Sequence, residues 1–286
     1  MKIVFSRKGF DSENGGIPSP IFPDGAFCSL PLLATDDKSN TKFDDLLAFD
    51  GHSMGKVVRD LSNGNIRPSR RIHFDPDLNK ALLPRLAGWR PICGRVIRSA
   101  SHLRDHGVGI GALILFFGWF RRVELQAGRY HFVRGSEDLH VLFGWLQIGE
   151  ILAAGPEMTK AAPKWARYHP HFLNNWGAEN AVYLASDTLS LAGLSKRIPG
   201  GGAFTQYSPE LRLTAPNCTR SIWRLPRSFH PKRGRSPLSR HPAERWTIEG
   251  DHTILRTFAR WQEAVLDTEQ CPEAIDWICD IVTTRA

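Results

Sequence analysis

The chain has 286 residues, which is enough for one large domain or two small ones with a buried core. With 42% hydrophobic residues, 23% charged residues and a net charge of +8, its composition excludes the disordered, collagen-like and coiled-coil classes. It has no apolar stretch long enough for a membrane helix, no signal peptide and no CxxC pair among five cysteines, so we expect a cytoplasmic protein without membrane partners, a disulfide framework or a thiolate zinc site.

Short elements separated by turns are expected in the first third of the chain. The apolar run 2–6 predicts a strand, and the glycine-rich segment 7–16 predicts a loop after it. Ser53 predicts the start of a helix that ends at Leu61. The spacing of apolar residues over 92–105 predicts a second helix.

Two long apolar runs in the middle of the chain, 112–120 and 139–148, predict strands. A hairpin over 123–132 is expected between them. In each run a glycine precedes a tryptophan, at Gly118 and Gly144, which predicts a bulge or a close backbone approach.

The last third of the chain mixes both types of element. Its patterns predict a strand over 181–185 and a flexible glycine loop over 199–202. They also predict two amphipathic helices, over 256–266 and over 273–282. Because helices and strands do not alternate regularly, we expect an α+β fold with a central mixed or antiparallel sheet and flanking helices, formed by a single domain over 1–286.

The positive charge is concentrated in two blocks. Residues 56–104 carry eleven Lys and Arg against three Asp and Glu, and residues 220–245 carry eight against one. Arginine dominates both blocks, and its planar guanidinium suits bidentate contacts with phosphate. The blocks predict a phosphate-bearing partner, a nucleotide or a nucleic acid, and a solvated basic face is the simpler alternative.

The densest polar motif is the segment His73-Phe74-Asp75-Pro76-Asp77. Alternate residues of an extended segment point to the same side, and Pro76 favours an extended Asp75, so His73, Asp75 and Asp77 are expected to converge. An imidazole with carboxylates can bind Fe(II), Mn(II) or zinc, or can act as general acid and base without a metal. In the alternative interpretation, the carboxylates cap the next helix and His73 packs.

A second motif is the segment 168–172, in which an extended chain would place His169 and His171 on one face. Imidazole is the commonest metal ligand, so the two motifs predict a metal site formed by His73, Asp75, His169 and His171. Since the chain has 11 histidines, an accidental pair is the alternative.

The loop over 7–16 combines cations, glycines and short polar side chains, which can cradle an anion. It matches neither the P-loop nor the dinucleotide-binding glycine pattern, and an ordinary glycine turn is the alternative. The residues that we expect to bind substrate here are Arg7, Lys8, Asp11, Ser12, Gly15 and Gly16.

Several strings follow one another along the chain: Ser6-Arg7-Lys8-Gly9-Phe10-Asp11-Ser12, His73-Phe74-Asp75-Pro76-Asp77, Ser101-His102-Leu103, Phe116-Phe117-Gly118-Trp119-Phe120-Arg121, Leu146-Gln147-Ile148-Gly149-Glu150 and Tyr168-His169-Pro170-His171. Together they resemble the nucleotide modification associated domain family, third type. The resemblance covers nearly the whole chain and implies a role in making or handling modified nucleotides, often with phage or mobile-element neighbours. It implies no settled reaction.

These strings add further candidate residues. His102 is a catalytic candidate, although an imidazole at a helix end also complements the helix dipole. Trp119, Arg121, Trp145 and Gln147 are candidates for substrate binding, because bases stack on tryptophan; packing in the core is the alternative for both tryptophans.

A weaker resemblance concerns the fold. The strands over 111–117 and 143–150 resemble those of PUA-like and EVE-like barrels, which bind RNA or modified bases. The resemblance implies a PUA-like β core at about 105–190 as the alternative to an open sheet, and such a likeness cannot assign a function.

Three functions are compatible with the sequence. The first is an enzyme of nucleotide or base modification, with or without a divalent metal, whose catalytic candidates are His73, Asp75, Asp77 and His102. The second is a PUA-like reader of modified or flipped bases that has no catalytic activity. The third, less favoured, is a metal-dependent nuclease used in defence or as a toxin.

Overall fold

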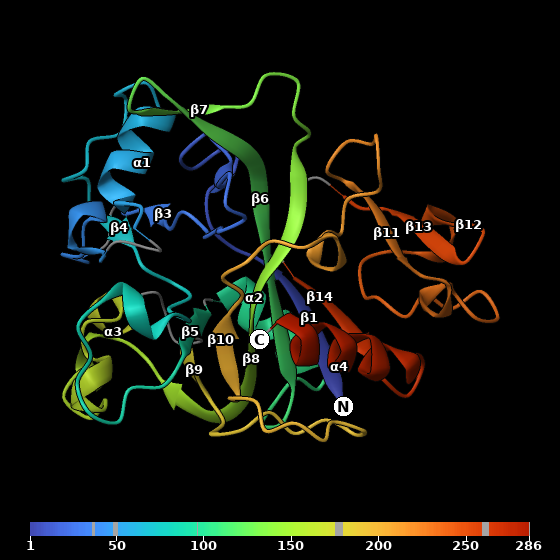
Figure 1. Ribbon diagram of the computed structural model, residues 1–286. Helices are drawn as coiled ribbons and strands as arrows, with labels where there is room; N and C mark the ends of the chain where they lie inside the picture. Colours follow the sequence, from blue (N-terminus) through green and yellow to red (C-terminus); the bar gives the residue numbers. More distant parts are fainter. Residues whose placement is uncertain (36–37, 48–50, 96, 175–179, 259–262, 286) are drawn as a thin grey trace.

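The computed structural model describes residues 1–35, 38–47, 51–95, 97–174, 180–258 and 263–285 (Figure 1). The main sheet contains nine strands: β1 (Lys2–Arg7), β2 (Ser19–Ile21), β5 (Ile92–Arg95), β6 (Leu113–Gln126), β7 (Arg129–Phe132), β8 (Leu139–Ala153), β9 (Ala181–Ala185), β10 (Gly201–Ala203) and β14 (Glu263–Asp267). Its order is β14-β1-β6-β8-β9-β5, with β2 and β7 paired to β6 and β10 paired to β8. Since β1 runs parallel to β6 and antiparallel to β14, the sheet is mixed.

Helices and two small sheets flank the main sheet. The α-helices of the described ranges are α1 (Met54–Leu61), α2 (Ile97–Asp105), α3 (Pro170–Leu173) and α4 (Glu273–Arg285). Single 3-10 turns occur at Phe43–Asp45, Lys80–Leu82, Pro156–Met158, Lys164–Ala166, Pro209–Leu211, Arg227–Phe229 and Ala243–Arg245. The small sheets contain β11 (Ile222–Pro226), β13 (His252–Arg256) and β12 (Trp246–Glu249), in that order, and β3 (Leu32–Leu33) with β4 (Ile72–His73).

This architecture confirms the expected α+β class with a large mixed sheet and flanking helices. In the described part of the chain, the main sheet is an open path of strands and not a closed barrel. Its centre is a pair of long strands, β6 and β8, which dominate the middle of Figure 1. Among the helices described, none is both long and apolar enough to cross a membrane.

Several elements form where the sequence predicts them. Ser53 caps α1, because its hydroxyl accepts a hydrogen bond from the amide of Lys56. The two glycines in the central strands mark close backbone contacts: a Cβ at Gly118 would lie 2.9 Å from the carbonyl oxygen of Lys8, and one at Gly144 would lie 2.7 Å from that of Gly202. The pairing of β6 with β8 also shifts register beside Gly144.

Three predicted elements differ in part from the structure. Helix α2 forms within the segment predicted as a helix over 92–105, but residues 92–95 form strand β5, because they pair with β9. The glycine segment 199–202 is partly strand, since β10 packs against Trp145. The segment 256–266 contains the end of β13 and most of β14 in place of a helix; residues 259–262 lie outside the described ranges.

The main sheet curls so that its two ends approach each other. Arg95 on β5, the last strand of the path, donates a hydrogen bond of 2.9 Å to the hydroxyl of Ser6 on β1, near the opposite end. Its Nε also lies 3.7 Å from a carboxylate oxygen of Glu263 on β14. Side chains therefore bridge a gap between strands that do not pair, and buried polar groups gather in that gap.

Candidate functional site

Asp75 lies in the gap between the two ends of the curled sheet. One carboxylate oxygen, Oδ1, accepts a hydrogen bond of 2.6 Å from the backbone amide of Gly94 on β5. The other, Oδ2, accepts one of 2.6 Å from the ammonium of Lys8, which directly follows β1. The side chain of Asp75 has no exposed surface. A buried carboxylate thus joins the two ends of the sheet.

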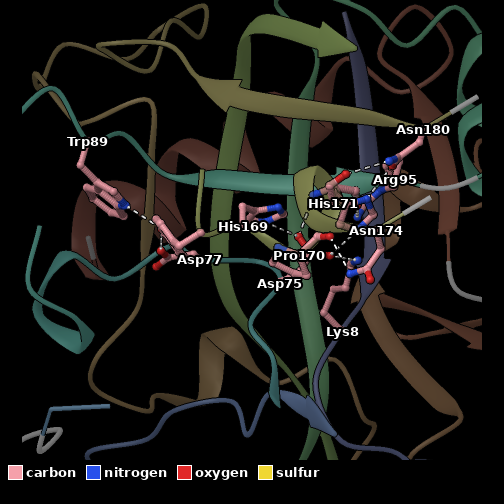
Figure 2. Close-up of polar contacts among 12 residues, drawn as sticks. Lys8, Asp75, Asp77, Trp89, Arg95, His169, Pro170, His171, Asn174 and Asn180 are labelled. Atoms are coloured by element: carbon pink, nitrogen blue, oxygen red, sulfur yellow. Dashed lines mark hydrogen bonds and ion pairs between the residues drawn. The ribbon is translucent and has the colours of Figure 1, made fainter. Parts of the chain in front are cut away.

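Two histidines from the start of α3 reach the same carboxylate, as Figure 2 shows. The Nε2 atom of His169 lies 3.3 Å from Oδ1 of Asp75, and the Nε2 atom of His171 lies 3.7 Å from Oδ2. Pro170 stands at the first position of α3, where its fixed φ suits the start of a helix. His169 precedes this turn with extended backbone, and His171 lies within it.

The third imidazole of the cluster belongs to His73 at the end of β4. The ring centroids of His73 and His171 lie 5.4 Å apart. One ligand atom from each of His73, Asp75 and His171 lies within 4.8 Å of the others. His73 is partly exposed while the other two are buried, so the cluster opens towards solvent on the side of His73.

Asn180 fixes the orientation of the His171 ring. Its amide nitrogen donates a hydrogen bond of 2.9 Å to the carbonyl oxygen of His171, so its amide oxygen faces Nδ1 of that ring at 2.7 Å. Nδ1 must therefore carry the proton, and a neutral ring has a bare lone pair on Nε2. Burial lowers the pKa of His171, which favours the neutral ring. The lone pair of Nε2 then faces the carboxylate of Asp75.

Charges within the cluster keep Asp75 ionised. Burial alone would raise the pKa of Asp75, but the ammonium of Lys8 acts against burial, and the pKa lies well below its ordinary value. Burial lowers the pKa of His169 to about 4, despite the nearby carboxylate. His169 is fully buried, and neither of its ring nitrogens makes a hydrogen bond. The site therefore combines an anionic carboxylate with neutral imidazoles.

Asp77 does not join this cluster. Its two oxygens accept hydrogen bonds of 2.5 and 2.7 Å from the guanidinium of Arg85, and the Tyr168 hydroxyl donates a further bond to it. Burial raises the pKa of Asp77, although Arg85 acts against that shift. The buried Asp77–Arg85 pair anchors the segment that follows Asp75, and no dashed line in Figure 2 joins Asp77 to a histidine.

The loop over 7–16 divides between two surroundings. Lys8 points into the cluster, whereas the guanidinium of Arg7 lies 3.9 Å from the carboxylate of Asp11. Asp11 accepts hydrogen bonds from the amides of Glu13 and Asn14, so it closes the turn. Within the turn, Ser12 and Gly16 are exposed and Gly15 packs against a phenylalanine ring.

The remaining predicted residues lie apart from the cluster. Trp145 is buried and donates a hydrogen bond to the carbonyl oxygen of Pro199, and Gln147 bonds to the backbone at Gly111 and Ser190. Three further candidates contact other side chains. The guanidinium of Arg220 lies over the ring of Trp119 at 4.1 Å. Arg121 forms a hydrogen bond with Ser136, and His102 forms one with Ser239. Burial, with Arg240 and His106 nearby, lowers the pKa of His102 to about 4.

Sequence reasoning missed the residues that organise the cluster from a distance. The amide of Gly94 binds Asp75, and the side chain of Asn180 orients His171. A backbone amide has no sequence signature, and a single asparagine outside any recognisable motif has none either. The periodic apolar pattern that suggested a helix at 92–105 also concealed the strand that carries Gly94.

The fold and the cluster define an α+β protein with a buried histidine–aspartate centre at the gap of a curled mixed sheet. The family described as nucleotide modification associated domain 3 matches residues 2–267, and the chain belongs to this family. The match includes β1, Lys8 and all members of the cluster, and it associates the chain with nucleotide modification. Searches of curated proteins and of solved structures gave no match.

Proposed function

We propose that this protein is an enzyme that modifies a nucleotide or a nucleic acid base, and that a divalent metal held by His73, Asp75 and His171 forms its reactive centre. The observation that carries the proposal is the 3.7 Å contact between Nε2 of His171 and Oδ2 of Asp75. A lone pair and a carboxylate oxygen repel each other unless a cation lies between them. Two bonds of about 2.1 Å, typical of imidazole and carboxylate ligands, can span that distance.

The chemistry of the donor set fits a divalent ion. Two imidazoles and one carboxylate are ligands of iron(II), manganese(II) and zinc sites that keep positions open for other molecules. The hydrogen bond from Nδ1 of His171 to Asn180 is the kind of outer contact that orients a ligating histidine. When bound, the ion would supply Lewis-acid activation of a water or of a substrate oxygen.

The protein's own groups have separate roles in this proposal. Lys8 neutralises part of the charge on Asp75, and Gly94 fixes the carboxylate through its amide. His169 is fully buried, and its ring would pack beside the centre next to Asp75. Substrate approaches from the side of His73, the partly exposed member.

The alternative function, a reader of modified bases, needs an aromatic ring on which a base can stack. Trp145 is buried in the core, and Arg220 lies over the ring of Trp119 at 4.1 Å. Both contacts favour an enzyme over a reader that relies on these two tryptophans.

The test measures modified nucleosides in cells that express the protein, because the cell then provides any co-substrate. DNA and RNA are digested to nucleosides, which are compared by mass spectrometry for wild type, Asp75→Asn, His171→Ala and the control His106→Ala. We expect a new nucleoside mass in wild type and control that disappears in both cluster variants. The same new mass in all four strains, or none in any, would contradict the proposal; broken plasmid DNA would indicate the nuclease.

A further inference from the structure

A hollow at the surface, away from the histidine–aspartate cluster, has several cationic and polar side chains in its lining. It lies between the end of β11 and the start of α4, and its lining includes Ser228, His230, Lys232, Arg233, Arg235 and Gln270. Lys232 pairs with Glu273 at 3.0 Å. Arg233 and Arg235 are exposed and make no ion pair within the described part of the chain. The hollow therefore has an uncompensated positive charge.

Arg233 occupies a backbone position that arginine seldom takes. The amide of Arg235 donates a hydrogen bond of 3.0 Å to the carbonyl oxygen of Lys232, with Arg233 at φ 53° and Gly234 at φ 72° between them. Positive φ at both central residues is the pattern of a type I′ turn, in which asparagine followed by glycine is strongly preferred. The turn geometry thus disfavours arginine at this exposed position, which points to a role for its charge.

The hollow and the cluster lie beyond opposite ends of β1. In the antiparallel pairing of β1 with β14, Lys2 is opposite Asp267 and Ser6 is opposite Glu263. Gln270 of the hollow comes after Asp267, which lies opposite the first residue of β1. Lys8 of the cluster comes directly after the last residue of β1. Six residues of strand at about 3.3 Å each separate the two sites by about 20 Å along the strand.

This separation exceeds what one nucleotide can span. Along one strand of a duplex, successive phosphates advance by about 3.4 Å, so about 20 Å corresponds to roughly six nucleotides. A phosphate in the hollow and a base at the cluster must then belong to different residues of one polymer. Guanidinium groups are the side chains best suited to bind phosphate oxygens in pairs.

We infer that the hollow formed around Arg233 and Arg235 binds backbone phosphates of a polynucleotide whose target base lies at the histidine–aspartate cluster. The substrate is thus a nucleic acid strand and not a free nucleotide. This inference rests on the proposed function for the identity of the reacting centre, while the phosphate contact itself is independent of that centre.

The test compares the double variant Arg233→Asn, Arg235→Gln with wild type in binding a fluorescent single-stranded oligonucleotide of about 20 nucleotides, over salt concentrations of about 50 to 200 mM. Arg233→Asn creates the preferred Asn-Gly turn, so the variant should unfold at the same temperature as wild type or higher. The matched control is Arg129→Gln, Arg134→Gln, which removes the same charge from exposed positions on and beside β7.

We expect the double variant to bind about tenfold more weakly, with the slope of log K against log salt smaller by about 1.4, because each lost phosphate contact on a single strand contributes about 0.7. The control should stay within about twofold of wild type. Equal losses in both variants, or an unchanged affinity in the first, would overturn the inference.

Two further measurements separate this inference from the proposed function. Titration with thymidine monophosphate should show no binding that depends on Arg233 and Arg235; such binding would overturn the assignment to a polymer. In a His171→Ala background, the double variant Arg233→Asn, Arg235→Gln should still lower the slope of log K against log salt by about 1.4, even where the metal is lost. A variant that loses the metal should therefore keep the phosphate contact. The double variant that loses the phosphate contact should keep its metal.

Discussion

The ammonium of Lys8 lies 2.6 Å from Oδ2 of Asp75, whose side chain is completely buried. The two residues are 67 positions apart in the chain. Their pair connects the end of β1 with the segment after β4, and the amide of Gly94 attaches the same carboxylate to β5. Asp75 is therefore both a link across the gap of the curled sheet and the centre of the candidate site.

Replacing Lys8 by methionine should destabilise the protein strongly, because a buried carboxylate loses its ammonium partner. Breaking a buried ion pair in this way costs about 3 kcal/mol. Lys2→Met is the control, since the Lys2–Asp267 pair is partly exposed and its loss should cost about 1 kcal/mol or less. Urea unfolding with and without added zinc or manganese measures both. If a divalent ion binds Asp75, it should restore part of the stability of Lys8→Met; equal losses in the two variants would contradict this account.

Adding one methyl group at Gly94 should disturb the metal site without changing any ligand. A Cβ at this position would lie 2.1 Å from the ring of His171, so the ring or strand β5, whose amide binds Asp75, must shift. Since misplaced ligands and outer contacts cost about 10- to 100-fold in metal affinity, Gly94→Ala should bind the metal at least tenfold more weakly. Gly202→Ala is a matched control, because its Cβ would meet the ring of Trp145 instead. Equal metal affinity in both alanine variants would argue against His171 as a ligand.

Replacing Asp77 should lower the stability of the protein and leave its metal content unchanged. Asp77→Asn leaves the guanidinium of Arg85 buried without its carboxylate, which should cost roughly 3 kcal/mol in the free energy of unfolding. For comparison, Glu273→Gln breaks the exposed Lys232–Glu273 pair and should cost less than about 1 kcal/mol. Metal content measured on folded Asp77→Asn should match wild type. A protein that folds normally but loses its metal would instead assign Asp77 to the centre.

The buried His140 should make the protein less stable in mild acid. Its Nδ1 accepts a hydrogen bond from the indole of Trp223, and burial lowers its pKa to about 3. Between about pH 6 and 4 the unfolded chain binds a proton there that the folded chain does not, so stability falls by up to about 1.4 kcal/mol for each unit of decreasing pH. His140→Asn keeps an acceptor for Trp223 and removes the titrating ring. Urea unfolding from pH 7 to 4 should show a shallower loss in the variant; parallel curves would show that His140 does not contribute.

The sequence predicted the parts of this molecule that depend on local patterns. The strand over 2–6, the cap at Ser53 and the long central strands follow from apolar runs and from one hydroxyl at the right position. The segment 92–95 could not be predicted in the same way, because a short apolar run fits a helix or a strand and only its pairing with β9 decides. The contacts across the gap of the curled sheet join Arg95 to Ser6 and Glu263, which are far apart in the chain.

The candidate site shows the same limit. The two motifs at 73–77 and 168–172 contain the histidines and the carboxylate that meet in the structure. Alternation along an extended chain also suggested that Asp77 would point the same way as Asp75. Asp77 instead pairs through its backbone with Ile92, and Arg85 holds its carboxylate away from the histidines.

Metal content tests the central claim most directly. The protein is purified without a histidine tag and without oxygen, and its metals are measured by plasma mass spectrometry beside His73→Ala, His171→Ala and the control His106→Ala. The account predicts close to one iron, manganese or zinc ion per chain in wild type and control, and its loss in the two ligand variants. Metal retained by both ligand variants, or none bound by wild type even after reconstitution, would contradict it.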